Sequence, residues 1–438
     1  MSSLEAAPDG APLGASSVRQ DVIGGLTTFF TMAYIIVVNP QILSTEGTGM
    51  PFAGVLTATV LIAATMTLLM GLYAKIPFAV APGMGLNAFF TYSIVLGQKV
   101  PWPTALGIVF WAGVAFLVIS VTPVREQIAQ AIPLPLRSAA AAGIGVFLTF
   151  IGLRNAGLVV ASPATFVTMG RLGAPSLLAL VGLVVMVALM RRRSPLALLG
   201  GMALVTLLGW ALGLVHAPAR LVSAPDFRAV FLKLDVIDAL RPALLPALLS
   251  ILFTDLFDSL STFVGVAHAT GLVDADGQPR RLKQGLVVDA LATLGAGLAG
   301  TSSGTAYIES AAGIEAGGRT GRASVVTALC FVPCLFLAPL AAMVPAFATA
   351  PVLILVGALM FRSVTRLDLE RLEDAIPAFL TVVLIPLTFS ITEGMLWGFL
   401  AHVVLYVLAG RRAEIRPAMY GIAFLSVLLL VLQASMSG

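Results

Sequence analysis

Apolar segments long enough to cross a lipid bilayer follow one another along almost the whole chain, with only short polar breaks between them. A membrane-spanning helix needs about 20 apolar residues, and every backbone N–H and C=O inside the hydrocarbon must be paired. The chain is 59% hydrophobic and 11% charged, whereas soluble domains carry about 25% charged residues. The sequence therefore predicts an all-α polytopic membrane protein with no folded extramembrane domain.

Apolar runs and helix-breaking residues divide the chain into 14 predicted membrane segments, seven before and seven after a polar connection at 217–242. The segments are 22–43, 53–74, 78–97, 103–123, 136–153, 173–190, 195–215, 243–267, 283–299, 302–317, 323–344, 350–362, 373–390 and 393–410. A further apolar run at 420–432 is short for a membrane span, and the sequence leaves its placement open. Residues 1–20 lack a signal-peptide pattern and are predicted to form a disordered cytoplasmic tail.

The distribution of basic residues tests this segmentation. With a cytoplasmic N-terminus, 18 of the 25 lysines and arginines fall on the cytoplasmic side, as expected from the excess of basic residues in cytoplasmic loops. We therefore predict a multi-pass protein of the cytoplasmic (plasma or inner) membrane with its N-terminus inside. The same bias accounts for the net charge of +4 without a nucleic-acid partner.

Seven segments per half place the second half upside down relative to the first, and transporters built from such inverted repeats bind substrate near the midplane, at interrupted helices. Alignment of APGMGLNAFF with SGTAYIESAA pairs Asn87 with Glu309, and alignment of TTFFTMAY with TDLFDSLS pairs Thr31 with Asp258. Small apolar residues also align by chance, so the sequence does not decide between an internal repeat and a chance alignment.

The third and tenth segments begin with residues that disfavour a helix. Pro82 and Gly83 stand before the helical part of the third segment, and a run of Gly, Ser and Thr at 300–305 opens the tenth. Each segment is therefore predicted to form a short extended piece and then a half-helix whose free N–H groups point inward. Facing half-helix ends would form a cradle for a polar ligand, with Gly83, Met84, Thr305 and Ala306 as candidate substrate-binding residues.

Acidic side chains lie inside these apolar segments. A charged group at the centre of a bilayer costs about 2.5 to 3.5 kcal/mol on insertion scales, so such residues usually mark a pathway. Asp258 and Glu309 are the first candidates for substrate binding and proton coupling; a structural ion pair or helix cap is the alternative. Asp255, one turn before Asp258, competes with it, and Asp289 either serves coupling or braces the core.

Burial favours the neutral form of an acid, so protonation of one carboxylate could accompany substrate binding. The sequence contains no P-loop, zinc-ligand spacing or Ser/His/Asp set in a suitable context. We therefore expect a transporter rather than an enzyme, with no cofactor, no metal and a proton as coupling ion.

Four segments carry a family resemblance: GGLTTFFTMAYIIVVNPQIL, APGMGLNAFFTYSIV, TDLFDSLSTFVGVAHATGLVD and GTSSGTAYIESAAGIEAGGRTG. In this order and spacing they resemble the AzgA-like purine permeases of the nucleobase and ascorbate transporter superfamily, over residues 18–412. The resemblance implies 14 membrane segments in two inverted repeats. It also implies proton-coupled uptake of adenine, guanine or hypoxanthine.

The resemblance further implies a core domain (21–125 and 243–345) and a gate domain (126–216 and 346–412), followed by a C-terminal apolar segment at 413–438. The family's acidic positions match Asp258 and Glu309, and its polar position in the third segment matches Asn87. Ser261 stands where relatives often have Gly, which is a modest departure.

Several alternatives stay open. A channel or facilitator would conduct without coupling, and uracil, xanthine or an anion such as sulfate are the other substrates that related folds suggest. Paired acids in the expected cavity argue against an anion. The preferred purine, the identity of the coupling ion and the existence of a homodimer are not decided by the sequence.

Overall fold

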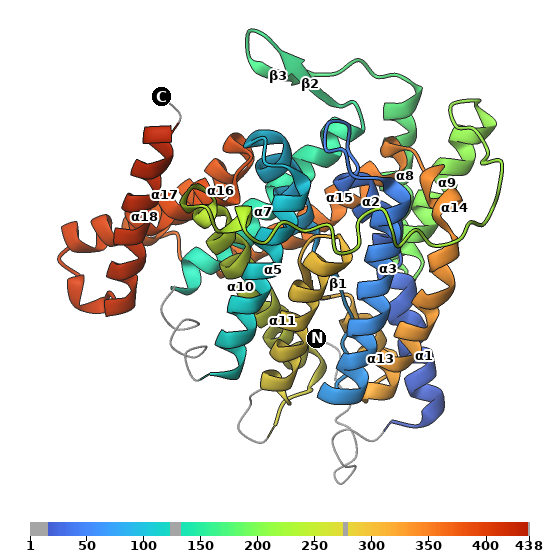
Figure 1. Cartoon of the computed structure of the whole chain (residues 1–438), viewed down its shortest axis with the longest axis horizontal. Coiled ribbons are helices and arrows are strands. Elements are labelled where there is room, and N and C mark those ends of the chain that lie inside the picture. Colours follow the sequence, from blue (N-terminus) through green and yellow to red (C-terminus); the bar gives the residue numbers. More distant parts are fainter. Residues whose placement is uncertain (1–15, 123–132, 275–278, 437–438) are drawn as a thin grey trace.

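The computed structural model describes residues 16–122, 133–274 and 279–436, and helices dominate it (Figure 1). Within these described residues, nine helices are long and apolar enough to cross a membrane. The prediction of a mostly helical membrane protein is therefore confirmed, while 14 crossings stay a prediction. The predicted N-terminal tail lies outside the described residues as far as residue 15, and the first helix already begins at Val18.

The first half of the chain contains ten helices and three strands in the described ranges. They are α1 (Val18–Met32), α2 (Ile35–Leu43), α3 (Phe52–Leu69), η1 (Met70–Ala74), β1 (Val80–Pro82), α4 (Met84–Ala88), η2 (Phe89–Gly97), α5 (Trp102–Val121), α7 (Leu134–Asn155), β2 (Val159–Ser162), β3 (Phe166–Met169), α8 (Ala174–Arg191) and α9 (Ala197–Ala211). Both η1 and η2 are π-helical. Such stretches occur mostly as single-turn bulges, frequently at functional sites, and η2 continues from the half-helix α4.

The second half begins after a polar connection and, in its described residues, contains one strand. Its main elements are α10 (Leu245–Thr270), α11 (Leu282–Ala299), β4 (Gly304–Ala306), α12 (Ser310–Glu315), α13 (Gly321–Phe331), α14 (Ala338–Ala342), α15 (Ala346–Phe361), α16 (Leu372–Thr388), α17 (Ile391–Leu408) and α18 (Pro417–Met436). In Figure 1, α17 and α18 lie at one edge of the molecule, whereas β1, α10 and α11 lie near its middle.

The two predicted extended pieces pair with each other. Strand β1 runs antiparallel to β4, with Val80 opposite Ala306, Ala81 opposite Thr305 and Pro82 opposite Gly304. Every residue of both strands is buried. Buried backbone polar groups need partners, and this pairing supplies them where neither segment can be helical. The prediction of extended pieces in the third and tenth segments is confirmed.

A second antiparallel pair, β2 with β3, joins Val159–Ser162 to Phe166–Met169. This hairpin projects from the helices at the top of the view (Figure 1), and all four residues of β3 are exposed. The sequence predicts only a polar break between helices here, so the all-α description is wrong in this detail. Two short apolar runs separated by a tight turn can pair locally without a wide buried face.

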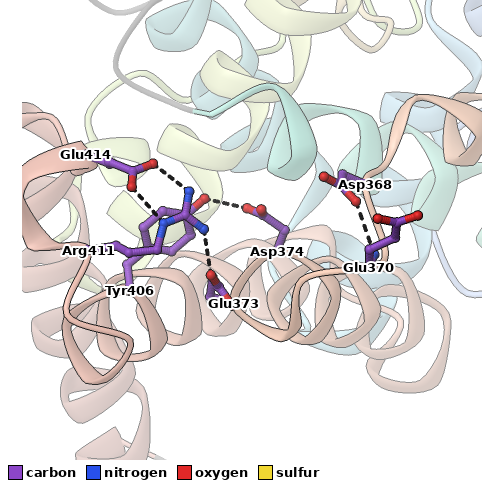
Figure 2. A network of polar contacts seen from close by, with 7 residues as sticks. All are labelled: Asp368, Glu370, Glu373, Asp374, Tyr406, Arg411 and Glu414. Carbon is purple, nitrogen blue, oxygen red and sulfur yellow. Dashed lines mark hydrogen bonds and ion pairs between the residues drawn. The ribbon is translucent and has the colours of Figure 1, made fainter.

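A polar network connects α16, α17 and the short helix η7 (Arg412–Glu414) (Figure 2). The guanidinium of Arg411 donates to both carboxylate oxygens of Glu414 at 2.7 and 2.6 Å and to Glu373 at 2.5 Å. It also lies 4.9 Å from the ring centre of Tyr406, whose hydroxyl donates to Asp374 at 2.6 Å. Bidentate arginine pairs of this kind impose a defined geometry, so the network holds these helix ends together.

Candidate functional site

Helices α10 and α11 each carry a buried acid and pack against strand β4. Asp255 and Ser259 lie one turn apart on α10, and Asp289 and Thr293 lie one turn apart on α11. Residues at this spacing share a helix face. The hydroxyl of each helix donates to the acid of the other, so the two helices are joined by crossed hydrogen bonds.

Asp255 is fully buried, and both of its hydrogen-bond partners are hydroxyl groups. Thr293 and Ser303 donate to its Oδ2, the latter at 2.8 Å. Its Oδ1 is buried and has no hydrogen-bond partner among the described residues. Burying a carboxylate without a positively charged partner costs free energy. Contact with water therefore does not explain why an acid occupies this position.

Asp289 occupies the matching position on α11 and is also fully buried. Its Oδ2 accepts a hydrogen bond from the hydroxyl of Ser259. The Ser259 hydroxyl also lies 2.8 Å from the hydroxyl of Thr305 on β4. Oδ1 of Asp289 lacks a partner within the described part of the chain.

Asp258 and Glu309 differ from this pair because both are only half-buried. The two carboxylates interact electrostatically. Glu309 stands immediately before α12, where its Oε1 accepts from the hydroxyl of Tyr34 at 2.7 Å. The neighbouring Ile308 is 61% exposed. Asp258 and Glu309 are therefore the acids that a ligand could reach.

Asn87, the third candidate, is fully buried in α4. Ser302 donates to its Oδ1, and its Nδ2 lies 3.9 Å from Sδ of Met84. The Asn87 side chain is thus hydrogen-bonded to the segment that immediately precedes β4. The preceding Thr301 accepts at 2.9 Å from Asn39, which is also buried. Three consecutive hydroxyl residues, 301–303, therefore contact three different helices: α2, α4 and α10.

The remaining candidates lie in the paired strands and beside them. The N–H of Gly83 donates to the carbonyl of Ser303 at 2.9 Å, so this amide is satisfied within the protein. Ala306 is buried in β4. A Cβ atom at Gly83 would lie 2.7 Å from Cγ2 of Thr305, so only glycine permits this approach. Met84 is buried at the start of α4.

The predicted free N–H groups at the start of the second half-helix are not found. The N–H of Ser310 donates to the carbonyl of Tyr307 at 3.1 Å, and that of Ala311 donates to Ile308 at 3.0 Å. A turn before α12 uses these donors, so the prediction of free donors is wrong at this end. Glu309 itself, rather than the α12 backbone, is the polar group presented there.

Sequence reasoning missed the hydroxyl residues that hold the acids. Tyr34, Ser259, Thr293 and Ser303 each bond one of the acidic candidates. The i, i+4 spacing of Asp255 with Ser259 and of Asp289 with Thr293 was a visible signal, since it places a hydroxyl on the same face as each acid. Among the residues that the structure describes, no group of three or more His, Cys, Asp or Glu could hold a metal ion.

The chain is similar over most of its length to known proteins. A model of the Permease family matches residues 19–396. The adenine permease AdeP of Escherichia coli K12 is 40% identical over 417 residues, which cover 95% of this chain and 93% of that protein. The guanine/hypoxanthine permease PbuO of Bacillus subtilis 168 is 38% identical over 419 residues, covering 94% and 96%.

A solved structure shares the fold at low sequence identity. The transmembrane domain of the cyanobacterial bicarbonate transporter BicA superimposes with a TM-score of 0.65 at 19% identity, covering 87% of this chain and 97% of that one. At this identity the likeness concerns the fold alone.

Proposed function

Since this chain belongs to the Permease family, whose model spans residues 19–396, we propose that it is a secondary active transporter that imports purine nucleobases by proton symport. Its relatives are permeases, which are transporters rather than enzymes. Their names specify adenine and guanine or hypoxanthine. The observation that carries the proposal for this chain is the pair of half-buried acids, Asp258 and Glu309, beside the paired strands β1 and β4.

The pair suits the edge of a purine. A purine base presents ring N–H donors and acceptor nitrogens around an aromatic plane, and ionised carboxylates are acceptors only. Asp258 and Glu309 would accept from the N–H groups, while the Tyr34 hydroxyl orients Glu309. Two acids in one site disfavour an anion such as sulfate by charge repulsion. Xanthine and uracil are the remaining nucleobase alternatives.

Proton coupling follows from the same groups. An acid that must enter a low-dielectric site takes up a proton more readily than one in water, so substrate binding and protonation can depend on each other. Glu309 and Asp258 are the first candidates, with Asp255 and Asp289 as the buried ones. An uncoupled channel or facilitator is the alternative mechanism.

The proposed transport cycle moves a core domain against a gate domain, as an elevator or by rocking. The core would consist of residues 21–125 and 243–345, which include β1, β4 and the acids, and the gate of 126–216 and 346–412. We propose 14 membrane segments in two inverted repeats, with the N-terminus in the cytoplasm. A homodimer is compatible with this scheme.

Uptake in a transport-deficient strain tests the function. Radiolabelled adenine, guanine, hypoxanthine, xanthine, uracil and sulfate are supplied separately, with and without an uncoupler. We expect accumulation of at least one of the first three above its external concentration, abolished by the uncoupler. Uptake that only equilibrates and ignores the uncoupler would identify a facilitator, and selective uptake of uracil, xanthine or sulfate would refute the purine assignment.

A further inference from the structure

Helix α8 is the candidate membrane span that the rest of the protein covers least. Within its span 28% of the residues are buried, against 44 to 67% in the other eight candidate spans of the described chain. Its buried face packs on α9 and α15, where a Cβ atom at Gly182 would lie 2.5 Å from Val205 and 3.3 Å from Pro351. The opposite face exposes apolar side chains at helical spacing, namely Leu177, Val181, Val184 and Val187.

Three consecutive arginines stand at the end of this exposed face. Arg191 is the last residue of α8, one turn after Val187 and two turns after Val184, so it continues the same face. Arg192 and Arg193 follow in the turn to α9, and all three arginines are exposed. Arg193 has a φ of 53°, a backbone conformation that favours glycine. The chain has a long cationic side chain at this turn instead.

The charges of this arginine triplet (191–193) are not neutralised within the protein. Among the residues that the structure describes, none of the three forms an ion pair with a carboxylate. In the sequence, residues 127–225 contain no Asp or Glu, so α7, α8, α9 and the segments that connect them supply no anionic partner. An anion from outside the chain is therefore the natural partner of the triplet.

Two further arginines are exposed at the same membrane surface, at the ends of η6 (Arg362–Arg366). The hydroxyl of Ser363 in η6 donates to the carbonyl of Ser138 near the start of α7 at 3.0 Å. Helix α8 returns from the far end of α7, so its arginines lie on the side on which α7 begins. Asp368 and Glu370 follow η6 closely and offset its charge, whereas no acid offsets that of the triplet.

We propose that Arg191, Arg192 and Arg193 bind the phosphate group of an anionic phospholipid whose acyl chains lie along the exposed face of α8. Guanidinium groups match phosphate oxygens with paired hydrogen bonds, which the ammonium of lysine does not provide. A phospholipid carries its phosphate directly above apolar tails, in the same order as the groups on α8. Basic residues at a membrane surface also attract anionic lipids electrostatically. This inference does not depend on the identity of the transported substrate.

Native mass spectrometry of the full-length protein tests the site, after reconstitution in phosphatidylcholine vesicles with or without phosphatidylglycerol. We expect the wild type to retain phosphatidylglycerol in preference to phosphatidylcholine. Arg191→Gln, Arg192→Gln and Arg193→Gln combined should lower this retention about tenfold or more, the scale of losing one hydrogen bond between charged groups. The corresponding triple lysine variant keeps the charge and should show a smaller loss. It also keeps the test decisive if the glutamine variant fails to insert.

The matched control combines Arg19→Gln, Lys283→Gln and Arg322→Gln. These residues are exposed near the starts of α1, α11 and α13, and the predicted topology places them on the same side as the triplet, so the change in charge is equal. The control should retain phosphatidylglycerol as the wild type does. Equal retention by the two glutamine variants would overturn the site, because only general surface charge would then act.

Two other ligands are distinguished in the same experiment. Displacement of the bound phosphatidylglycerol by inorganic phosphate would show that the arginines recognise free phosphate, and would overturn the lipid assignment. A dimer that carries no phospholipid and is lost in the triple glutamine variant would show that a second copy of this chain covers the face, and would overturn it as well.

Discussion

At the scale of single residues, Glu309 is half-buried, and its carboxylate accepts a hydrogen bond from the hydroxyl of Tyr34 at 2.7 Å. We predict that Glu309→Gln abolishes concentrative purine uptake while expression and membrane insertion stay normal, because an amide keeps the size but cannot release a proton or act only as an acceptor. Uptake driven by an imposed pH gradient measures this. Tyr34→Phe should raise KM more mildly, by about tenfold or more, since one hydrogen bond to a charged group is worth about 1.5 to 3 kcal/mol. Normal pH-driven accumulation by Glu309→Gln would exclude Glu309 from coupling.

The two acids one turn apart on α10 are expected to have different tasks. Asp258 is half-buried and interacts with Glu309, whereas Asp255 is fully buried against Thr293 and Ser303. We predict that Asp258→Asn weakens purine binding much more than Asp255→Asn does. Equilibrium binding of labelled purine to the two purified variants decides between them. A larger loss of affinity in Asp255→Asn would move the substrate site one helical turn along α10.

At the scale of elements, the pairing of β1 with β4 positions the site, and Gly83 permits their close approach. A Cβ atom there would lie 2.7 Å from Cγ2 of Thr305. We predict that Gly83→Ala lowers the free energy of unfolding by about 1 to 3 kcal/mol, the usual cost of overpacking a tight interior. Thermal unfolding in detergent measures this effect, and purine affinity should fall in parallel as β4 shifts.

The control at the same scale is Gly265→Ala on α10. No atom lies within 4 Å of a Cβ built at this position, and alanine is the better helix former by about 1 kcal/mol. This variant should be as stable as the wild type or slightly more so. Equal destabilisation by Gly83→Ala and Gly265→Ala would show that the β1–β4 contact is no more sensitive to an added methyl group than the α10 surface is.

At the scale of the whole molecule, transport by alternating access requires the proposed core and gate domains to move past each other. The η2 helix and the link between α16 and α17 meet where Ser93 donates to the carbonyl of Phe389. The Phe389 ring also makes edge contacts with Phe147 and Phe150 of α7, at 5.3 and 5.4 Å. We predict that a disulfide between Ser93→Cys and Phe389→Cys, in a background without Cys330 and Cys334, stops transport and that a reductant restores it.

The two single-cysteine variants serve as controls for loss of the Phe389 ring or the Ser93 hydroxyl. Both should transport with and without oxidant. Undiminished uptake by the fully cross-linked pair, with cross-linking quantified by mass spectrometry, would show that these two elements do not separate during the cycle.

The sequence alone predicted the properties that depend on residues close to one another along the chain. Runs of apolar residues predicted a mostly helical membrane protein, and Pro82, Gly83 and the run at 300–305 predicted the interrupted segments, because helix propensity and backbone freedom act within a few residues. The acids were visible as charges in apolar surroundings. The family resemblance rested on the same local patterns, and the match over residues 19–396 confirms it.

Only the tertiary structure decided how these parts meet. The register of β1 against β4 joins residues more than 200 positions apart, and it is the packing of α10, α11 and β4 that leaves Asp258 reachable while burying Asp255 and Asp289 completely. The contacts of Ser259 with Asp289 and Thr305 follow from the same packing. Such contacts depend on the relative placement of whole elements, which no local propensity encodes, and they separate a reachable acid from a buried one.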